Sequence, residues 1–395
     1  MYLQYPNKKT ESQILNTEKA TLEIQTGQGA VNKLIQGDNL AVLKSLLEDY
    51  DLGGKVDLIY IDPPFATNGH FKIGEERANS ISSSKGDEIA YSDVLVGDDF
   101  LEFLRERLIL LRELMSEKGS IYLHIDYKIG HYVKLIMDEV FGKQNFRNDI
   151  TRIKCNPKNF YRKAYGNIKD LILFYSKTDS PIWNDPKNPF SDEDVERLFK
   201  KVDENGRKYT TIPLHAPGET VNGKTGQKWG SIEPPKGRHW RSKPEILEEW
   251  DKQGLIEWSA NGVPRKKIFI DEKDGKKMQD IWEFKDPQYP QYPTEKNIDM
   301  LKLIISASSN EDSIVLDSFC GSGTTLIAAQ ELNRSWIGID KSDHAIKVVK
   351  NKLLKFQPSL FSKIKFELIK QVEIQSKIVT GSSIKIQQPK AEFSY

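Results

Sequence analysis

Two separate blocks of the sequence alternate short apolar runs with amphipathic stretches, and this alternation constrains the fold more than any other feature. The run VDLIYID at 56–62 has the composition of a strand that is buried on both faces of a parallel sheet. The stretch DFLEFLRERLILLRELM, which ends at Met115, repeats apolar residues at helical spacing. Strands that alternate with helices predict an open α/β sheet.

The first block covers 31–142. It predicts a strand and a helix around a turn at Gly37–Asp38, then strands at VDLIYID and GSIYLHID, and a helix at YVKLIMDEVFG. The second block begins with a helix at NIDMLKLIISASS. It continues with strands at SIVLDSF and SWIGID, and with helices at GSGTTLIAAQEL and HAIKVVKNKLLKF.

Between the blocks the sequence is rich in Lys, Arg, Trp, Pro and Gly, and only DLILFYSK and EILEEWDKQG show clear periodicity. The simplest interpretation is one α/β domain in two sequence pieces with a different module inserted between them. The predicted parts are an N-terminal extension at 1–30, a first half at 31–150, an insertion at 151–285, a second half at 286–356 and a tail at 357–395. Residues 66–97, which are rich in Gly, Ser and charge, are predicted to be a loop.

Composition limits the class of protein. A chain of 395 residues exceeds what one hydrophobic core usually holds. The two cysteines, Cys155 and Cys320, exclude a disulfide framework and favour a cytoplasmic protein. No apolar run approaches the roughly 20 residues that span a membrane, and no metal is expected. The net charge of +1 means that any nucleic-acid surface must be local.

The segment DSFCGSGTT predicts a ligand-binding turn between a strand and a helix. Gly321 and Gly323 allow the backbone to approach a ligand, and no P-loop lysine follows them. Asp340 ends the next strand, 17 residues after Gly323, where an acid commonly accepts hydrogen bonds from ribose hydroxyls. This pattern favours a nucleoside cofactor without phosphates.

The motifs DPPF at 62–65 and DSFCGSGTT together resemble those of DNA amino-methyltransferases, which use S-adenosylmethionine. Their order resembles the permuted β class, which includes the modification subunits of type III restriction systems. YPTEKN at 292–297 and LIQGDNLAVLKSL at 34–46 are similar to further motifs of that class. The resemblance implies a doubly wound, mostly parallel, Rossmann-like methyltransferase sheet of seven strands, circularly permuted, with an inserted target-recognition domain. The class often forms homodimers.

The resemblance assigns the halves of the domain. The first half is catalytic and the second binds the cofactor. Asp340 would accept from the ribose, Asp38 would meet the cofactor's adenine, and Thr294 with Lys296 would bind the methionine carboxylate. The full set of cofactor residues implied is Asp38, Thr294, Lys296, Asp317, Phe319, Gly321, Gly323 and Asp340.

The predicted catalytic residues are Asp62, Pro63, Pro64 and Phe65. The exocyclic amine of adenine is a poor nucleophile, because its lone pair is delocalised into the ring. The Asp62 carboxylate and the Pro63 carbonyl would accept hydrogen bonds from the two N–H groups of this amine. The two prolines hold the carbonyl at a fixed angle. Phe65 would stack on a base flipped out of the double helix. Asp62 is interpreted as an orienting acceptor, because the proton leaves after methyl transfer.

Basic residues predict a DNA surface. The segment 143–177 contains nine Lys or Arg and two acids, with aromatic residues interleaved, and 224–243 is similar. The predicted partner is double-stranded DNA, and the candidate contacts are Lys154, Lys158, Arg162, Lys163, Arg238 and Arg241.

Several alternatives remain open at this point. One alternative is methylation of the N4 amine of cytosine, which uses the same acceptor arrangement. RNA is an alternative substrate, and a restriction subunit is an alternative partner. A non-catalytic DNA-binding module is the alternative from another class. Methylation at carbon-5 of cytosine needs a nucleophilic cysteine, which follows a proline in that family. Neither cysteine here follows a proline, so Cys320 is interpreted as a packing residue. His124 and Asp126 are expected to satisfy local hydrogen bonds.

Overall fold

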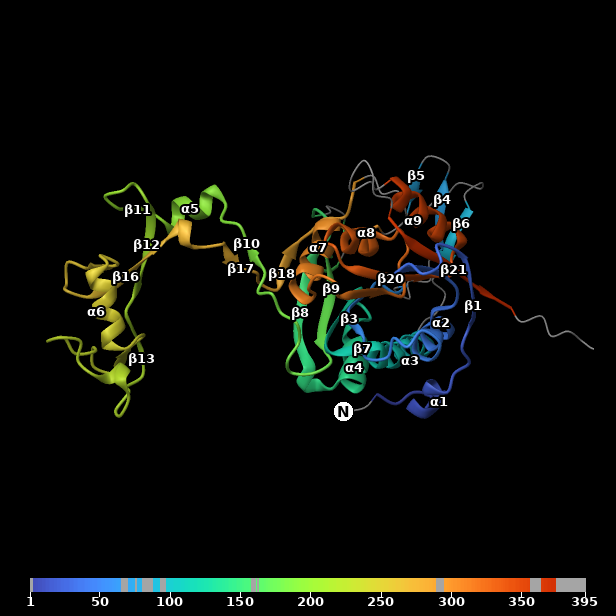
Figure 1. Cartoon of the computed structure of the whole chain (residues 1–395), viewed down its shortest axis with the longest axis horizontal. Helices are drawn as coiled ribbons and strands as arrows, with labels where there is room; N and C mark the ends of the chain where they lie inside the picture. The colour runs from blue at the N-terminus through green and yellow to red at the C-terminus, as the bar shows by residue number, and fades with distance from the viewer. Residues whose placement is uncertain are drawn as a thin grey trace, which may run out of the picture. The chain divides into compact units, whose positions relative to one another are not determined.

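The computed structural model describes residues 3–64, 70–74, 77–79, 88–92, 97–157, 161, 163–288, 295–355 and 364–373. The chain divides into two compact units, both traced in Figure 1. The first combines Met1–Asn184 with Asp280–Tyr395, and the second is Asp185–Gln279. The predicted insertion at 151–285 contains the second unit, and its two ends supply strands to the sheet of the first unit.

A mixed sheet forms the centre of the first unit. Among the described residues its order is β1 (Thr21–Thr26), β21 (Phe366–Val372), β2 (Asn32–Gln36), β20 (Ser335–Asp340), β19 (Ile314–Asp317), β3 (Val56–Ile61), β7 (Met115–Ile125), β9 (Lys169–Ser176), β8 (Phe146–Ile153) and β18 (Ile281–Glu283). Neighbours pair in parallel except at β1–β21, β7–β9 and β8–β9. The mostly parallel sheet confirms the predicted fold class.

The sheet has ten strands where the resemblance predicted seven. In the spatial order of the sheet, the seven neighbouring strands β2, β20, β19, β3, β7, β9 and β8 match the predicted number. The other three strands extend it, with β21 and β1 beyond β2 and with β18 beyond β8. Strand β1 comes from the N-terminal extension and β21 from the predicted tail. Strand β1 is mostly polar, and β21 mixes four apolar residues with Glu367, Lys370 and Gln371, so both carry a weaker strand signal than the continuous apolar run of β3.

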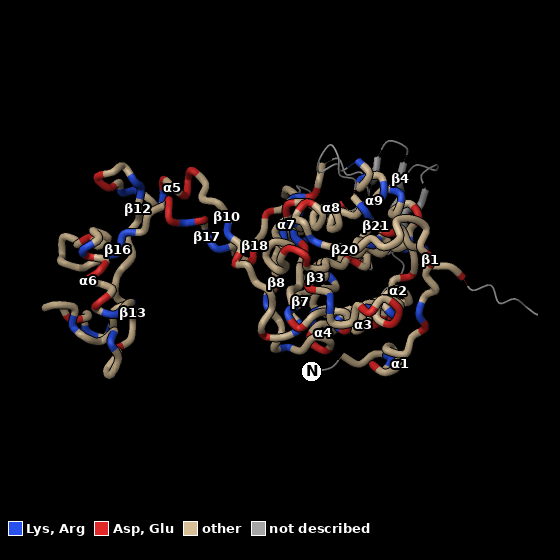
Figure 2. Tube along the Cα trace, viewed as in Figure 1, with Lys and Arg blue, Asp and Glu red and all other residues tan. Residues whose placement is uncertain are grey.

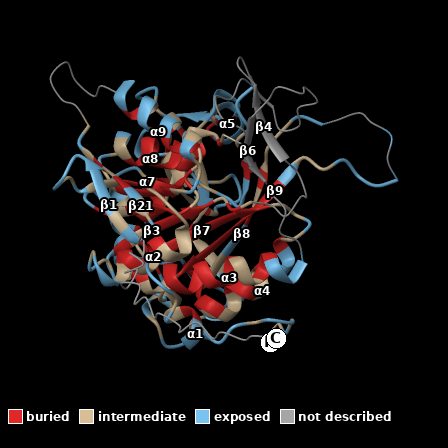
Figure 3. Ribbon diagram, turned by 90° about the vertical axis from the view of Figure 1, so that its right-hand side faces the viewer, coloured by how far each residue is buried: buried red, intermediate tan, exposed pale blue. Residues whose placement is uncertain are grey.

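Helices cover both faces of the sheet, which Figure 3 draws as a buried layer between them. One face carries α2 (Asn39–Glu48), α3 (Gly97–Leu114) and α4 (Gly130–Phe141); the other carries α7 (Ile298–Ser308), α8 (Thr324–Glu331) and α9 (Asp343–Lys355). A short helix, α1 (Glu11–Leu15), packs against α3. No helix in the described part of the chain has both the length and the apolar character needed to cross a membrane.

The core lies where α3 packs on the sheet. Phe100, Leu104 and Leu108 of α3 are fully buried in one cluster with Ile59 of β3 and Ile121 of β7. Each such side chain contributes about 1.5–3 kcal/mol by burial. This packing holds β3 rigidly, and β3 carries the DPPF motif at its carboxyl end.

The segment 66–97 differs from the loop that its composition predicts. Its described backbone includes β4 (His70–Gly74), β5 (Arg77–Asn79) and β6 (Glu88–Ser92), which pair into a small antiparallel sheet. The short runs HFKIG and EIAYS contain aromatic and β-branched residues, which favour strands. The surrounding Gly, Ser and charged residues obscured that signal.

The second unit has its own small core. Its main sheet consists of β11 (Lys201–Val202), β12 (Lys208–Pro213), β16 (Pro264–Phe269) and β15 (Ile256–Trp258). A second pair, β13 (His215–Pro217) and β14 (Arg238–Trp240), lies against a cluster of Leu214, Trp229, Trp240, Leu247 and Ile256. The helices are α5 (Asp192–Leu198) and α6 (Pro244–Lys252). Near the ends of the unit, β10 (Lys187–Asn188) pairs with β17 (Lys276–Lys277).

Candidate active site

Four aspartates occupy the carboxyl ends of four neighbouring parallel strands. Asp38 follows β2 closely, Asp340 ends β20, Asp317 ends β19, and Asp62 follows β3. The register aligns these ends, since Gln36 lies opposite Asp340 and Leu316 lies opposite Ile59. Four of the predicted site residues are therefore brought to one edge of the sheet from two distant parts of the chain.

This edge contains a topological switch point. The chain leaves β3 towards α3 and β7, whereas it leaves β19 towards α8 and β20 on the other side. Loops that diverge from two adjacent strands leave a crevice outside their carboxyl ends, and ligands of open α/β sheets bind there. Asp62 and Asp317 flank this crevice, although 254 residues separate them in the sequence.

Asp62 combines a paired oxygen with an unpaired one. Its Oδ2 lies 2.5 Å from the Nζ of Lys296, and the two side chains are only 17% and 9% exposed. Its Oδ1 is buried and has no hydrogen-bond partner among the described residues. Pro63 is buried and Pro64 is half-buried, so the turn after the strand is well packed. A buried acceptor without a donor indicates a place for a ligand's N–H group.

The glycine turn between β19 and α8 has the conformation that its sequence predicts. Gly321 and Gly323 have φ of 46° and 74°, in the left-handed region that favours glycine. A Cβ on Gly323 would approach Val349 Cγ2 to 2.7 Å. Cys320 is buried in this turn, and burial raises the pKa of its thiol well above the usual value, which agrees with a packing role.

Asp340 connects the turn to the next strand. Its Oδ2 accepts from the N–H of Gly321 at 2.9 Å, and its Oδ1 accepts from the N–H of Ser342 at 2.8 Å. Burial raises the pKa of this carboxyl, against the effect of those two hydrogen bonds. Each oxygen keeps a lone pair that could accept a ligand hydroxyl.

Asp317 is buried beneath the turn. It accepts from Thr325 Oγ1 at 2.6 Å and from the N–H of Phe319 at 3.0 Å. Burial raises the pKa of Asp317 to about 7, with Asp62 and Asp340 adding to the shift. Asp317 thus fixes the shape of the turn, and Phe319 is half-buried with its ring 6.1 Å from that of Phe103.

A buried arginine that the sequence did not single out supports the same turn. Arg107 of α3 donates through Nε to Asn39 Oδ1 at 2.6 Å, and Asn39 Nδ2 donates to the Ser318 carbonyl at 2.8 Å. Arg107 also lies 3.5 Å from Asp38 Oδ1, at the start of α2. Burial lowers the pKa of Arg107 to about 10, which Asp38 and Glu106 oppose. An arginine within an otherwise apolar helical stripe was the available signal.

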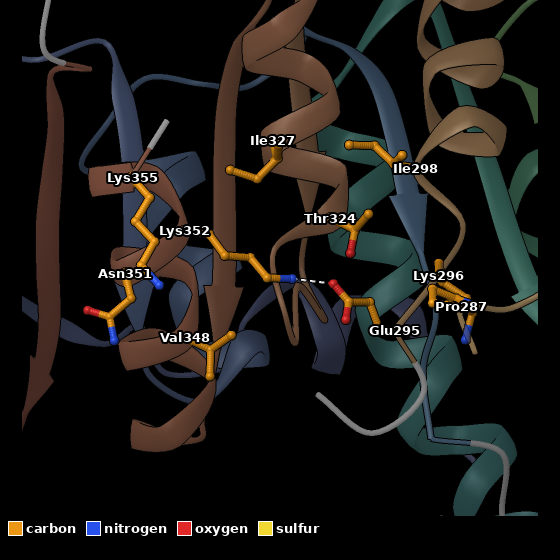
Figure 4. A pocket seen from close by; sticks show the side chains of 10 residues that line it. All are labelled: Pro287, Glu295, Lys296, Ile298, Thr324, Ile327, Val348, Asn351, Lys352 and Lys355. Carbon is orange, nitrogen blue, oxygen red and sulfur yellow. Dashed lines mark hydrogen bonds and ion pairs between the residues drawn. The ribbon is translucent and has the colours of Figure 1, made fainter. Parts of the chain in front are cut away.

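A cavity of about 700 Å³ adjoins the site at Lys296 and Thr324 (Figure 4). Side chains of α8 and α9 form one wall, and Pro287, Glu295, Lys296 and Ile298 form the other. Lys352 of α9 pairs with Glu295 across the opening. Lys296 therefore lies between this cavity and Asp62. Thr294, Phe65, Lys158 and Arg162 lie outside the described residues.

His124 and Asp126 both satisfy hydrogen bonds within the fold. His124, at the end of β7, is fully buried between Tyr60 and Asp170, and its Nδ1 lies 3.9 Å from Asp62 Oδ1. Asp126 accepts from the N–H of Lys128 at 2.8 Å. No described group of three or more His, Cys, Asp or Glu side chains is arranged to hold a metal ion.

The other candidate DNA contacts are dispersed. Lys154 pairs with Asp170 at 2.6 Å and is only 24% exposed, whereas Lys163 is exposed. Arg238 and Arg241 are exposed in the second unit. Figure 2 shows Lys and Arg interspersed with Asp and Glu along both units, so a DNA surface has to be argued from local clusters.

The residues at the sheet edge fit S-adenosylmethionine. Ser318 Oγ is buried in the glycine turn without a hydrogen-bond partner among the described residues. Asp340 offers acceptors for ribose hydroxyls, and Lys296 offers a cation for a carboxylate. An orphan hydroxyl, an acceptor pair and a buried cation together match the polar groups of this cofactor.

Comparison with known proteins gives consistent similarities. The model of the family described as DNA methylase matches residues 56–351. A protein named type II methyltransferase M.EcaI, from Enterobacter cloacae, is 39% identical over 386 residues, which are 94% of this chain and 82% of that protein. The type III restriction-modification enzyme StyLTI Mod subunit, from Salmonella typhimurium, is 27% identical over 339 residues. These residues are 76% of this chain and 50% of that subunit. The crystal structure of an M1.HpyAVI–SAM complex has 18% identity and a TM-score of 0.43, covering 81% of this chain and 99% of that one.

Proposed function

Because this chain belongs to the DNA methylase family, we propose that it methylates the exocyclic N6 amine of adenine at a specific DNA sequence. The family membership makes it a DNA amino-methyltransferase of the restriction-modification kind, with S-adenosylmethionine as methyl donor. The preference for adenine over cytosine is our proposal. It rests on the aspartate that opens the DPPF motif at 62–65, which in this class of enzyme favours adenine, whereas serine favours cytosine.

The observation that carries the proposal is the buried Oδ1 of Asp62 at the switch point, which has no hydrogen-bond partner within the described part of the chain. An amine that enters the crevice could donate one N–H to this oxygen and the other to the Pro63 carbonyl. Two acceptors pull the amine towards tetrahedral geometry and localise its lone pair on nitrogen. Positioning of this kind contributes several kcal/mol to a displacement reaction.

The bound cofactor supplies an electrophilic methyl group on a sulfonium. The chain's own residues hold the reactants in line: Asp340 and the glycine turn would bind the nucleoside part, and Lys296 the carboxylate. Asp62 acts by orientation and charge, since a carboxylate at the developing ammonium stabilises the transition state more than the neutral ground state.

The second unit is proposed to recognise the target sequence. Its β13–β14 pair brings Arg238 within 3.2 Å of His215 Nδ1. Burial lowers the pKa of His215, and the charges of Arg238, Arg241 and Arg265 lower it further. None of the three forms an ion pair with a described residue. Arg265 already donates to Thr211 Oγ1 and to the Thr211 carbonyl. The exposed Arg238 and Arg241, whose charge no described acid neutralises, suit phosphate oxygens and guanine edges.

One experiment tests the chemistry directly. The purified chain is incubated with DNA and S-adenosylmethionine, and a nuclease digest is analysed by mass spectrometry. We expect N6-methyladenine, and Asp62→Ala should reduce its formation by at least a hundredfold while DNA binding is retained. N4-methylcytosine alone would refute the adenine proposal. Failure to bind the cofactor in calorimetry would favour a non-catalytic DNA-binding module.

A further inference from the structure

A buried network lies directly behind Asp62. His124 is 0% exposed at the end of β7. Its Nδ1 lies 2.9 Å from the Tyr60 hydroxyl, and its Nε2 lies 3.3 Å from Asp170 Oδ2 on β9. Tyr60 is two residues before Asp62 on β3. The imidazole is therefore fixed in orientation by groups on two strands.

The charges around the network determine which nitrogen carries the proton. Asp170 contacts Lys154 Nζ at 2.6 Å and lies 3.8 Å from Arg152. Burial alone would raise the pKa of Asp170, but the hydrogen bond and charge of His124, together with Lys154, hold it below its usual range. Asp170 is thus a carboxylate that accepts from Nε2–H. The Nδ1 lone pair then accepts the O–H of Tyr60 and faces Asp62.

Asp62 presents to this same nitrogen the oxygen that no described residue hydrogen-bonds. Oδ1 lies 3.9 Å from Nδ1, while Oδ2 is held by Lys296. Lys296 and Arg152 are cations in ion pairs, so they cannot accept a proton. Burial raises the pKa of the Tyr60 phenol well above its usual value, so it keeps its proton. Of the described groups around Asp62, His124 is the one that offers a basic lone pair.

We propose that His124, held by Asp170, is a positioning residue that receives the proton released by the methylated amine through Asp62. This inference rests on the proposed function of Asp62. It assigns a purpose to a buried His–Asp pair that packing alone would not require, since burial of a polar pair carries a desolvation cost.

The proton transfer balances in two steps. After methyl transfer the amine is a cation; one N–H bond breaks, its electron pair stays on nitrogen, and an O–H bond forms on Asp62. The Tyr60 hydroxyl then turns away and releases the Nδ1 lone pair. The Asp62 O–H bond breaks as Nδ1–H forms, and the Tyr60 oxygen accepts from that new N–H. The product is an imidazolium paired with the Asp170 carboxylate, and Asp62 regains its charge. After the product leaves, the imidazolium returns its proton to water by the same route, through Asp62.

The test is the pH profile of single-turnover methylation between pH 5.5 and 9. Burial lowers the pKa of His124, against the hydrogen bond to Asp170, with Lys296 lowering it and Asp62 raising it. The wild-type rate should fall at low pH as His124 becomes protonated. His124→Asn should lower the rate at pH 7 about tenfold or more and remove that acidic limb. Asp170→Asn should move the limb to lower pH, because the carboxylate stabilises the imidazolium.

The matched control is Tyr122→Phe, which also loses a buried hydrogen bond on β7, to Ser308 at 2.8 Å, but has no link to Asp62. We expect its pH profile to equal that of the wild type. Cofactor binding and the fluorescence of 2-aminopurine at the target base report whether the variants stay folded and flip the base. An acidic limb unchanged in both His124→Asn and Asp170→Asn overturns the inference. The same experiment tests the proposed function separately. If the wild type methylates DNA and Asp62→Ala does not, the proposed role of Asp62 holds whatever the His124 variants show.

Discussion

Lys296 offers the sharpest prediction, because the structure pairs it with Asp62 and the proposed function assigns it to the cofactor as well. In the free chain its ammonium is paired with Asp62 at 2.5 Å. The methionine carboxylate of the cofactor would compete for the same cation. A charge-assisted hydrogen bond contributes about 1.5–3 kcal/mol. Lys296→Ala should therefore weaken cofactor binding, but by less than the full value, because the existing pair no longer has to be broken.

The expected size of the effect follows from that exchange. Taking the existing ion pair at about 1 kcal/mol net leaves a loss of about 0.5–2 kcal/mol, or roughly two- to thirtyfold in the dissociation constant. Asp62→Asn should do the opposite. It removes the competing carboxylate, so cofactor affinity should rise by about fivefold while methylation is abolished.

Calorimetry with two ligands separates this effect from general damage. S-adenosylmethionine carries the carboxylate, whereas 5′-methylthioadenosine lacks it, so Lys296→Ala should weaken binding of the first and leave the second within about twofold. Lys352→Ala is the control, because Lys352 lines the same cavity but pairs with Glu295. Equal losses for both ligands in Lys296→Ala, or an unchanged affinity in Asp62→Asn, would refute the shared role of this lysine.

Three further predictions concern other parts of the chain. Gly323→Ala should weaken cofactor binding and lower the melting temperature, since its Cβ would meet Val349 at 2.7 Å and φ is 74°; calorimetry and thermal unfolding measure both. Burial raises the pKa of Asp317 to about 7. The free energy of unfolding should therefore decrease as the pH rises from about 4 to 7, because the carboxyl group ionises at lower pH in the unfolded chain than in the folded one. Asp317→Asn should remove that loss in urea unfolding, and an equal pH slope would contradict the assignment. A variant with alanine at Arg238, Arg241 and Arg265 should bind DNA more weakly and with a shallower salt dependence, by about one unit of slope for each phosphate that is no longer neutralised. Arg207→Ala is its control, because Arg207 is already paired with Asp271 and Glu272.

Strong periodicity made much of the fold predictable from the sequence. The run at 56–62 is β3, and the amphipathic stretch that ends at Met115 is α3, which ends at Leu114. Strands β1 and β21 were not predicted, because β1 is mostly polar and both depend on tertiary pairing, β1 with β21 and β21 with β2. Such pairing is a tertiary effect that local sequence does not encode.

The candidate site divides in the same way. Short motifs at strand ends identified Asp62, Asp317 and Asp340, because the carboxyl ends of parallel strands converge at one edge. The pairing of Lys154 with Asp170 was not visible, since a count of charges along 143–177 cannot tell a lysine that meets phosphate from one that meets an acid on the next strand. Arg107 was missed for a related reason: its partners lie on α2, far away in sequence.

The pairing of β10 with β17 has a consequence for how specificity could change. The polypeptide enters the second unit and leaves it again through two short strands that are hydrogen-bonded to each other. The unit also has its own apolar cluster, which shares no residue with the core of the first unit. Everything between these two crossing points could be exchanged for a relative's equivalent without altering the sheet that holds Asp62. Because we propose that the second unit recognises the target, recombination at these two junctions would give new sequence preferences while the chemistry is inherited intact.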